Sequence, residues 1–202
     1  MARVDAAGLR VCSHIMAPMT LFTQRLCLRR WRTKDIAPFA DMNADPLTMR
    51  FMPGVLSRAE TEALVQRFEA HHDAHGFGVW AIEAPGVAPL VGYTGLQRVS
   101  FEAPFAPAVE VGWRLAPAFW GRGYATEAAR EALRFGFEDL NLDQIVSFTV
   151  EANKPSWSVM ERLGMVRNPA EDFDHPRLPA GHPLRRHILY RLEREQWQAR
   201  QT

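Results

Sequence analysis

The chain has 202 residues, of which 47% are hydrophobic and 23% charged, and its formal net charge is +1. This length suits one domain with a sizeable core, and the composition is ordinary for a globular protein. The near-zero charge gives no reason to expect binding to nucleic acid or to a membrane surface through bulk charge. No apolar run approaches the roughly 18 residues that a membrane span needs. Arg10 and His14 make the N-terminus a poor signal peptide, so we expect a cytoplasmic protein.

The N-terminal segment and the cysteines bear on domain organisation. Residues 1–20 read as a flexible tail, in which a later methionine could be the true start, and residues 21–202 are expected to form one domain. Cys12 and Cys27 share no metal or redox spacing, so we expect neither a disulfide framework nor a cysteine metal site.

In chain order, the first half of the sequence predicts two capped helices and four strands. An alternating strand comes first, then a helix that Thr33 can cap, an irregular segment with two prolines, and a helix that opens on the capping box Ser57-Arg58-Ala59-Glu60 and ends at Gly76. These elements span residues 26–31, 34–42, 45–56 and 57–75. Three further strands are expected at residues 78–83, 90–96 and 109–115.

The second half predicts a helix at 124–140, a strand at 144–150, a short helix at 155–163 closed by Gly164, and a last strand at 186–192 before a polar tail. This order is not a regular alternation of strand and helix. It therefore predicts a mixed α/β domain with a run of antiparallel strands in its middle.

The stretch APAFWGRGYATEAAR places two glycines, Gly121 and Gly123, immediately before a predicted helix. The first turn of a helix leaves N–H groups without partners and is partly positive, and glycine lets the backbone approach an anion closely. The loop therefore reads either as an anion site or as a simple turn. Two nucleotide motifs fail: no Walker A string occurs, and a dinucleotide fingerprint would need Gly or Ala where Thr126 stands.

Four segments, in order, resemble known protein segments: TQRLCLRRWRTKDIAPFADMNADP, VEVGWRLAPAFWGRGYATEA, VEANKPSWSVMERLGM and HPLRRHILYRL. Together they resemble the GNAT superfamily of acyl-CoA-dependent N-acyltransferases, and within it the RimJ/RimL-like group of ribosomal-protein acetyltransferases. In the acyl-CoA loop, Gly123 and Ala125 match the family pattern, whereas Trp120 replaces the usual first polar residue. The resemblance implies an α/β (α+β) GNAT fold, with a mixed, mostly antiparallel sheet splayed between its fourth and fifth strands and flanked by helices.

The resemblance also implies acetyl-CoA as the acyl donor, without a metal. Loop N–H groups would hold its pyrophosphate, and the strand segment at 112–115 and an asparagine after the fifth strand would hold its pantetheine arm. Arg122 is read either as a phosphate contact or as a solvated cation. The expected cofactor-binding residues are Trp113, Arg114, Leu115, Arg122, Gly123, Tyr124, Ala125, Thr126 and Asn153.

Acyl transfer to an amine also needs proton transfer, since alkyl amines are mostly protonated at pH 7. Glu110 lies on the strand beside the expected cofactor cleft and is read either as the base, directly or through water, or as the structural partner of Arg114 or another cation. The tyrosine that many GNAT enzymes use as an acid is replaced by Met160. The resemblance therefore implies Ser156 as the acid and Asn153 as a cofactor contact, although both residue types are also common at helix starts.

Four histidines are further candidate functional residues. His71 and His75 lie one helical turn apart but have no evident third metal ligand, whereas His175 and His182 lie in a proline-rich loop and either touch substrate or order the loop.

The sequence thus predicts an N-acetyltransferase that works by direct attack of a primary amine on acetyl-CoA. The acceptor is a protein N-terminus, such as that of a ribosomal protein, or a small molecule. The alternative is a non-catalytic acyl-CoA-binding homologue. The sequence does not decide between a monomer and a homodimer, nor whether other acyl-CoAs serve as donors.

Overall fold

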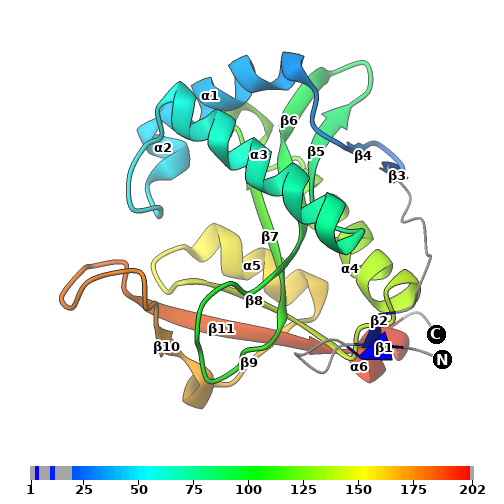
Figure 1. Cartoon of the computed structure of the whole chain (residues 1–202), viewed down its shortest axis with the longest axis vertical. Helices are drawn as coiled ribbons and strands as arrows, with labels where there is room; N and C mark the ends of the chain where they lie inside the picture. Colours follow the sequence, from blue (N-terminus) through cyan, green and yellow to red (C-terminus); the bar gives the residue numbers. More distant parts are fainter. Residues whose placement is uncertain (1–2, 5–9, 12–19, 201–202) are drawn as a thin grey trace.

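A mixed β-sheet forms the centre of the molecule (Figure 1). The computed structural model describes residues 3–4, 10–11 and 20–200, and within them nine strands join in the order β10-β11-β8-β7-β6-β5-β4-β3, with β9 beside β11. Their bounds are β3 Thr20–Phe22, β4 Cys27–Arg29, β5 Val79–Ala84, β6 Ala88–Arg98, β7 Val109–Leu115, β8 Gln144–Val150, β9 Val166–Arg167, β10 Phe173–Asp174 and β11 Arg186–Glu193. All neighbours are antiparallel except β7 and β8, which are parallel and share one residue pair.

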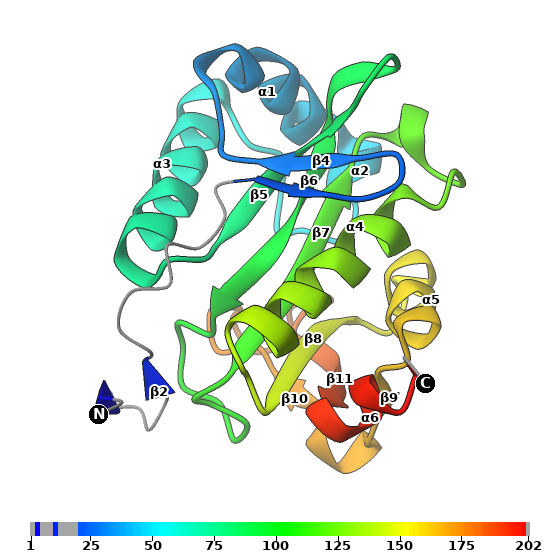
Figure 2. The same ribbon diagram turned by 90° about the vertical axis from the view of Figure 1, so that its right-hand side faces the viewer.

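Helices cover both faces of this sheet, as Figure 2 shows. The helices are α1 Ile36–Ala44, α2 Pro46–Met49, α3 Arg58–His75, α4 Tyr124–Arg134, α5 Lys154–Leu163 and α6 Arg194–Gln198. Phe39 of α1 and Phe68 of α3 pack with Val79 and Tyr93 in one core, while α4 packs its small residues against the other face in a second core. Among the described residues, no helix is long and apolar enough to cross a membrane.

The expected fold is confirmed: the sheet is mixed, mostly antiparallel, flanked by helices, and open between the strands that correspond to the fourth and fifth of the family. Side chains alternate between the two faces along β7, as in any strand. Val109, Val111 and Leu115 are buried with α4, whereas Arg114 lies on the opposite face against Tyr93.

Several predicted ends differ from the structure for local reasons. Thr33 does not cap the first helix, because Asp35 accepts the Arg32 N–H at 2.8 Å and α1 begins after a 3-10 turn. The helix expected to reach residue 140 changes to a π-helical turn at Phe135–Asp139. Gly136 lies in that turn, and a Cβ there would meet Ile145 Cδ1 at 2.6 Å. The polar tail contains α6, which buries Trp197.

The N-terminal tail expected at residues 1–20 lies largely outside the described residues, as does Cys12. The described parts of it are Thr20 and two short strands, β1 Arg3–Val4 and β2 Arg10–Val11, which pair antiparallel with each other.

Candidate active site

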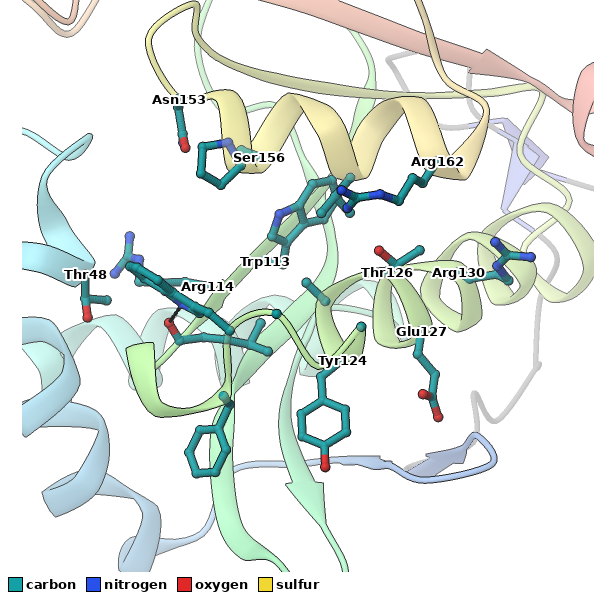
Figure 3. Close-up of a pocket in the computed structure, with 18 of the residues that line it drawn as sticks. Thr48, Trp113, Arg114, Tyr124, Thr126, Glu127, Arg130, Asn153, Ser156 and Arg162 are labelled. Carbon is teal, nitrogen blue, oxygen red and sulfur yellow. Dashed lines mark hydrogen bonds between the residues drawn. The ribbon is translucent and has the colours of Figure 1, made fainter.

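The opening of the sheet lies between β7 and β8, where Glu110 and Val146 form the one residue pair that joins the two strands. A cavity of about 860 Å³ is lined by the C-terminal end of β7, the start of α4 and the start of α5, which follows β8 (Figure 3). The α2 segment, residues 48–52 at the end of α2 and just after it, contributes further lining residues. The expected cofactor residues that line the cavity are Trp113, Arg114, Leu115, Gly123, Tyr124, Ala125, Thr126 and Asn153, and Ser156 lines it too.

The backbone of β7 offers hydrogen-bond donors on its open edge. Ala116 donates its N–H to the Val91 carbonyl of β6 at 3.0 Å. Because N–H groups alternate between the two edges of a strand, those of Trp113 and Leu115 point away from β6, toward the opening. The Leu115 carbonyl faces the same way and accepts the Trp120 indole N–H at 2.7 Å. Trp120 therefore has a structural reason to stand where the family has a polar residue.

The N-terminus of α4 opens onto the cavity without a side-chain cap. Gly123 is its N-cap at φ 79°, and Gly121 precedes it at φ 73°. The first helical bond runs from the Glu127 N–H to the Gly123 carbonyl, so the N–H groups of the preceding turn have no helical acceptor. By contrast, Ser57 caps α3 with its side chain. Gly121 and Gly123 therefore form a turn, and the same turn leaves backbone N–H groups that can bind an anion.

The start of α5 departs from ordinary helix capping. Asn153 occupies the N-cap position but makes no side-chain cap; its Nδ2 donates to Thr149 Oγ1 at 2.9 Å. Asn153 lines the cavity, and this bond uses its Nδ2 and not its side-chain Oδ1. The Ser156 hydroxyl makes no hydrogen bond to another described residue and also faces the cavity. Met160, one turn further, is 1% exposed in the core, so the usual acid position is an apolar packing position here.

Glu110 is part-buried on the face of β7 that also carries Gly112 and Arg114. Desolvation raises the pKa of its carboxyl to about 8. Within the described part of the chain no cation pairs with it, and Arg114 instead donates to Asn43 Oδ1 at 2.8 Å. The ion pair with Arg114 or another cation, which is the alternative role of Glu110, is thus not seen among the described residues. Glu110 does not itself line the cavity, but it lies on β7 at the point where the strands part.

Three arginines outside β7 lie at different places relative to the cavity. Arg122 is exposed, lies 5.9 Å from the Phe119 ring and does not line the cavity. Arg130 of α4 and Arg162 of α5 line the cavity. Glu127, one turn before Arg130, pairs with Arg25 at 2.6 Å. Arg130 lies about two helical turns beyond Gly123 and Arg162 lies on another helix, so no local pattern links either residue to the glycine loop.

The α2 segment is the part of the cavity wall that sequence reasoning missed. It contributes Thr48, Arg50, Phe51 and Met52. This stretch lacks helical or strand periodicity, so nothing in it marked a site. The one available signal was Asp45-Pro46, because Asp45 caps α2 by accepting the N–H groups of the next turn.

The histidines hold local structure. His71 bonds the Phe77 carbonyl through Nδ1 at 2.8 Å and accepts the Arg98 N–H through Nε2 at 3.2 Å. His182 accepts the Leu184 N–H, which orders its loop, and His175 packs on Phe101. In the part of the chain that is described, no group of three or more His, Cys, Asp or Glu side chains is arranged to hold a metal ion.

Comparison with known proteins gives a consistent result. A family model described as acetyltransferase (GNAT) domain matches residues 25–166. The uncharacterised N-acetyltransferase YnaD of Bacillus subtilis is 28% identical over 180 residues, which cover 89% of this chain and 99% of that protein. The FsC-acetyl coenzyme A-N(2)-transacetylase of Aspergillus fumigatus is 36% identical over 128 residues, covering 60% of this chain and 52% of that protein. The crystal structure of an acetyltransferase (GNAT family) from Bacillus anthracis matches with a TM-score of 0.72 at 27% identity, over 88% of this chain and 99% of that one.

Proposed function

The chain belongs to the acetyltransferase (GNAT) family, and from that premise we propose that it transfers an acetyl group from acetyl-CoA to a primary amine, which attacks the thioester directly within a ternary complex. One observation carries the proposal: the uncapped N-terminus of α4 and the unpaired edge of β7 line the same cavity. Acetyl-CoA matches these hydrogen-bond donors, because its pyrophosphate would meet the N-terminus of α4 while the amides of its pantetheine arm would meet the edge of β7.

The donor site combines charge and backbone hydrogen bonds. The N–H groups of Tyr124, Ala125 and Thr126 would hold the pyrophosphate at the partly positive helix end. The N–H groups of Trp113 and Leu115 would bond the pantetheine arm and, at its end, the thioester carbonyl. A backbone donor aimed at the oxygen where negative charge develops is a large catalytic term. Asn153 would accept from a pantetheine amide while Thr149 holds its side chain in place.

Two residues are proposed for proton transfer. Glu110 accepts the proton of the amine, directly or through water, and its raised pKa matches a base that works near neutral pH. Ser156 donates a proton to the departing thiolate, which Met160 cannot do. Arg130 and Arg162 line the same cavity as the α4 N-terminus and would add positive charge for the phosphates of the donor. Arg122, being exposed, is proposed as a contact to an outer phosphate.

Both binding and turnover need to be measured, because the alternative function is a non-catalytic acyl-CoA-binding homologue. The thermal midpoint should rise with acetyl-CoA and much less with NAD or ATP at the same concentration, since a ligand specific for the native state stabilises it by mass action. Thiol release from acetyl-CoA should then depend on an added amine. Stabilisation without thiol release across a broad panel of amines would favour the alternative, and equal stabilisation by NAD would contradict both.

A further inference from the structure

The cations that line the cavity fall into two sets at opposite ends. Arg130 and Arg162, from α4 and α5, lie on one side of the cavity in Figure 3, whereas Arg114 and Thr48 lie on the other, with Trp113 between them. The first set lies toward the α4 helix and suits the phosphates of the donor. Arg114 is left at the end formed by β7 and α2, away from these groups.

Buried polar side chains hold the Arg114 guanidinium in one orientation. Arg114 Nη1 donates to Asn43 Oδ1 at 2.8 Å, and Asn43 Nδ2 donates to Thr61 Oγ1 at 3.2 Å. Asn43 and Thr61 are both fully buried, at 0% exposure. The guanidinium also lies 5.4 Å from the centre of the Tyr93 ring. Burying two polar side chains is unfavourable unless they are hydrogen-bonded. The hydrogen bonds from Arg114 to Asn43 and from Asn43 to Thr61 therefore fix the arginine in place.

The charge of Arg114 is not neutralised within the described part of the protein. Other arginines of limited exposure have carboxylate partners: Arg29 pairs with Asp35 at 2.7 Å, and Arg167 pairs with Asp172 at 2.6 Å. No described carboxylate lies within ion-pair distance of Arg114. Arg50 also lines the cavity, over the Trp120 ring at 5.6 Å. A fixed, unneutralised guanidinium at a cavity wall is suited to bind an anionic oxygen group.

The position of Arg114 relates this anion site to the acceptor. Glu110, Gly112 and Arg114 alternate onto one face of β7, so Glu110 and Arg114 lie about 13 Å apart along the strand, with no side chain at Gly112 between them. The Glu110 carboxyl extends over Gly112, where an added Cβ would lie 3.8 Å from its Oε1. An acceptor whose amine meets Glu110 would have its remaining part directed toward Arg114.

We propose that the acceptor is a primary amine that also carries an anionic oxygen group, a carboxylate or a phosphate, and that Arg114 binds this group. This inference rests on the proposed acetyl transfer and names the chemical class of its acceptor. Arg114 acts here through its side chain, on the face opposite the one that α4 covers.

Matched pairs of acceptors test the proposal. One arm compares amino carboxylates of increasing chain length with their carboxamides, and the other compares an amine with a phosphate monoester against its parent amino alcohol. The wild-type kcat/KM should favour the anionic member by tenfold or more in at least one arm, through a lower KM. In Arg114→Gln, which keeps a donor for Asn43 Oδ1, this ratio should fall toward one, while Arg114→Lys should retain much of it. Arg130→Gln is the control: it should raise the KM for acetyl-CoA and leave the ratio unchanged.

The same pairs should be titrated into the CoA-bound protein by calorimetry, which needs no turnover. Binding of the anionic member alone, lost in Arg114→Gln, supports the proposal even where thiol release fails and the proposed function is wrong. Turnover or binding without preference for the anionic member overturns it and leaves the acetyl transfer standing. If Arg114→Gln does not fold, the wild type and Arg114→Lys still decide through the ratio within each pair.

Discussion

At the scale of single residues, Glu110 is the group whose chemistry depends most on its surroundings. The carboxyl is desolvated and has no described cation beside it, so its pKa rises to about 8. A base must be ionised to accept a proton, and this one ionises just above neutral pH. Its pH dependence can therefore be predicted for both activity and stability.

For activity, the wild-type kcat/KM should rise with pH and bend near pH 8 as Glu110 ionises in the free enzyme. Glu110→Gln should lower turnover by roughly 10²-fold, the lower end for general-base catalysis, and should lack the bend. The KM for acetyl-CoA should stay nearly constant, because the carboxylate takes no part in phosphate binding. A variant with wild-type turnover and the same bend would exclude Glu110 as the base.

For stability, the sign follows from proton binding. The unfolded chain loses the Glu110 proton near pH 4.3, whereas the folded chain keeps it until about pH 8, so the folded state binds more protons in between. Rising pH therefore destabilises the wild type across this window. Glu110→Gln removes this effect and should melt at a higher temperature than the wild type at pH 8, by a margin that shrinks toward pH 4.5. A difference in melting temperature independent of pH would show that Glu110 is not desolvated.

Asn153 offers a second test at this scale, with a matched control elsewhere in the chain. Asn153→Ala should raise the KM for acetyl-CoA by on the order of tenfold, the loss of about one hydrogen bond at a partly buried site. Asn168 is also an N-cap asparagine, but its side chain does cap its turn, by accepting the Ala170 N–H at 3.2 Å. Asn168→Ala should cost a little stability and leave that KM unchanged. Equal effects of the two changes on this KM would show that Asn153 does not contact the donor.

Residue roles were predictable from sequence where they depend on local pattern and not where they depend on distant partners. The orientation of Glu110 and Arg114 follows from strand alternation, and the apolar character of Met160 is read directly. That Arg114 bonds Asn43, rather than Glu110, depends on a contact between residues 71 positions apart. No periodicity or spacing contains that information.

At the scale of elements, the start of α4 is the feature on which donor binding depends. Its two glycines have positive φ, a conformation that costs an L-residue about 1–2 kcal/mol. A substitution there would therefore change stability as well as binding. Gly86, in the turn between β5 and β6, provides the comparison: φ is 75° there and 73° at Gly121, and an added Cβ meets nothing within 4 Å at either.

Gly121→Ala and Gly86→Ala should accordingly lower the melting temperature by similar amounts. Only Gly121→Ala should weaken acetyl-CoA binding, measured by calorimetry, because only Gly121 lines the cavity at the helix N-terminus. Equal acetyl-CoA affinity in the two variants would contradict the anion site at α4.

Long and well-capped elements were predicted closely, and short ones were not. The helix expected at 57–75 is observed as Arg58–His75, because its capping box and its closing glycine, Gly76 at φ 74°, are both local signals. Strands β3, β9 and β10 have two or three residues and exist through pairing with β4 or β11, which local sequence cannot show. The four-residue helix α2 is also too short to show a pattern in the sequence. The cavity residues at its end and just after it, near the proposed acceptor site, were therefore missed.

At the scale of the whole molecule, the site exists because two parallel strands fail to stay paired. Composition and periodicity predict a mixed domain, but the opening between β7 and β8 was expected through family resemblance alone. Parallel pairing and its interruption depend on how α4 and α5 pack together in the core beside the opening, which a linear pattern does not encode.

A crystal structure of the protein with CoA bound would test the proposed donor and acceptor sites together. We expect the pyrophosphate at the N–H groups that begin α4, and the pantetheine amides on the open edge of β7 and on Asn153. The thiol sulfur should lie beside Ser156. The Arg114 guanidinium should remain free of the cofactor and bonded to Asn43. A cofactor bound with its phosphates away from α4, or with Arg114 on a phosphate, would contradict both the proposed reaction geometry and the acceptor site.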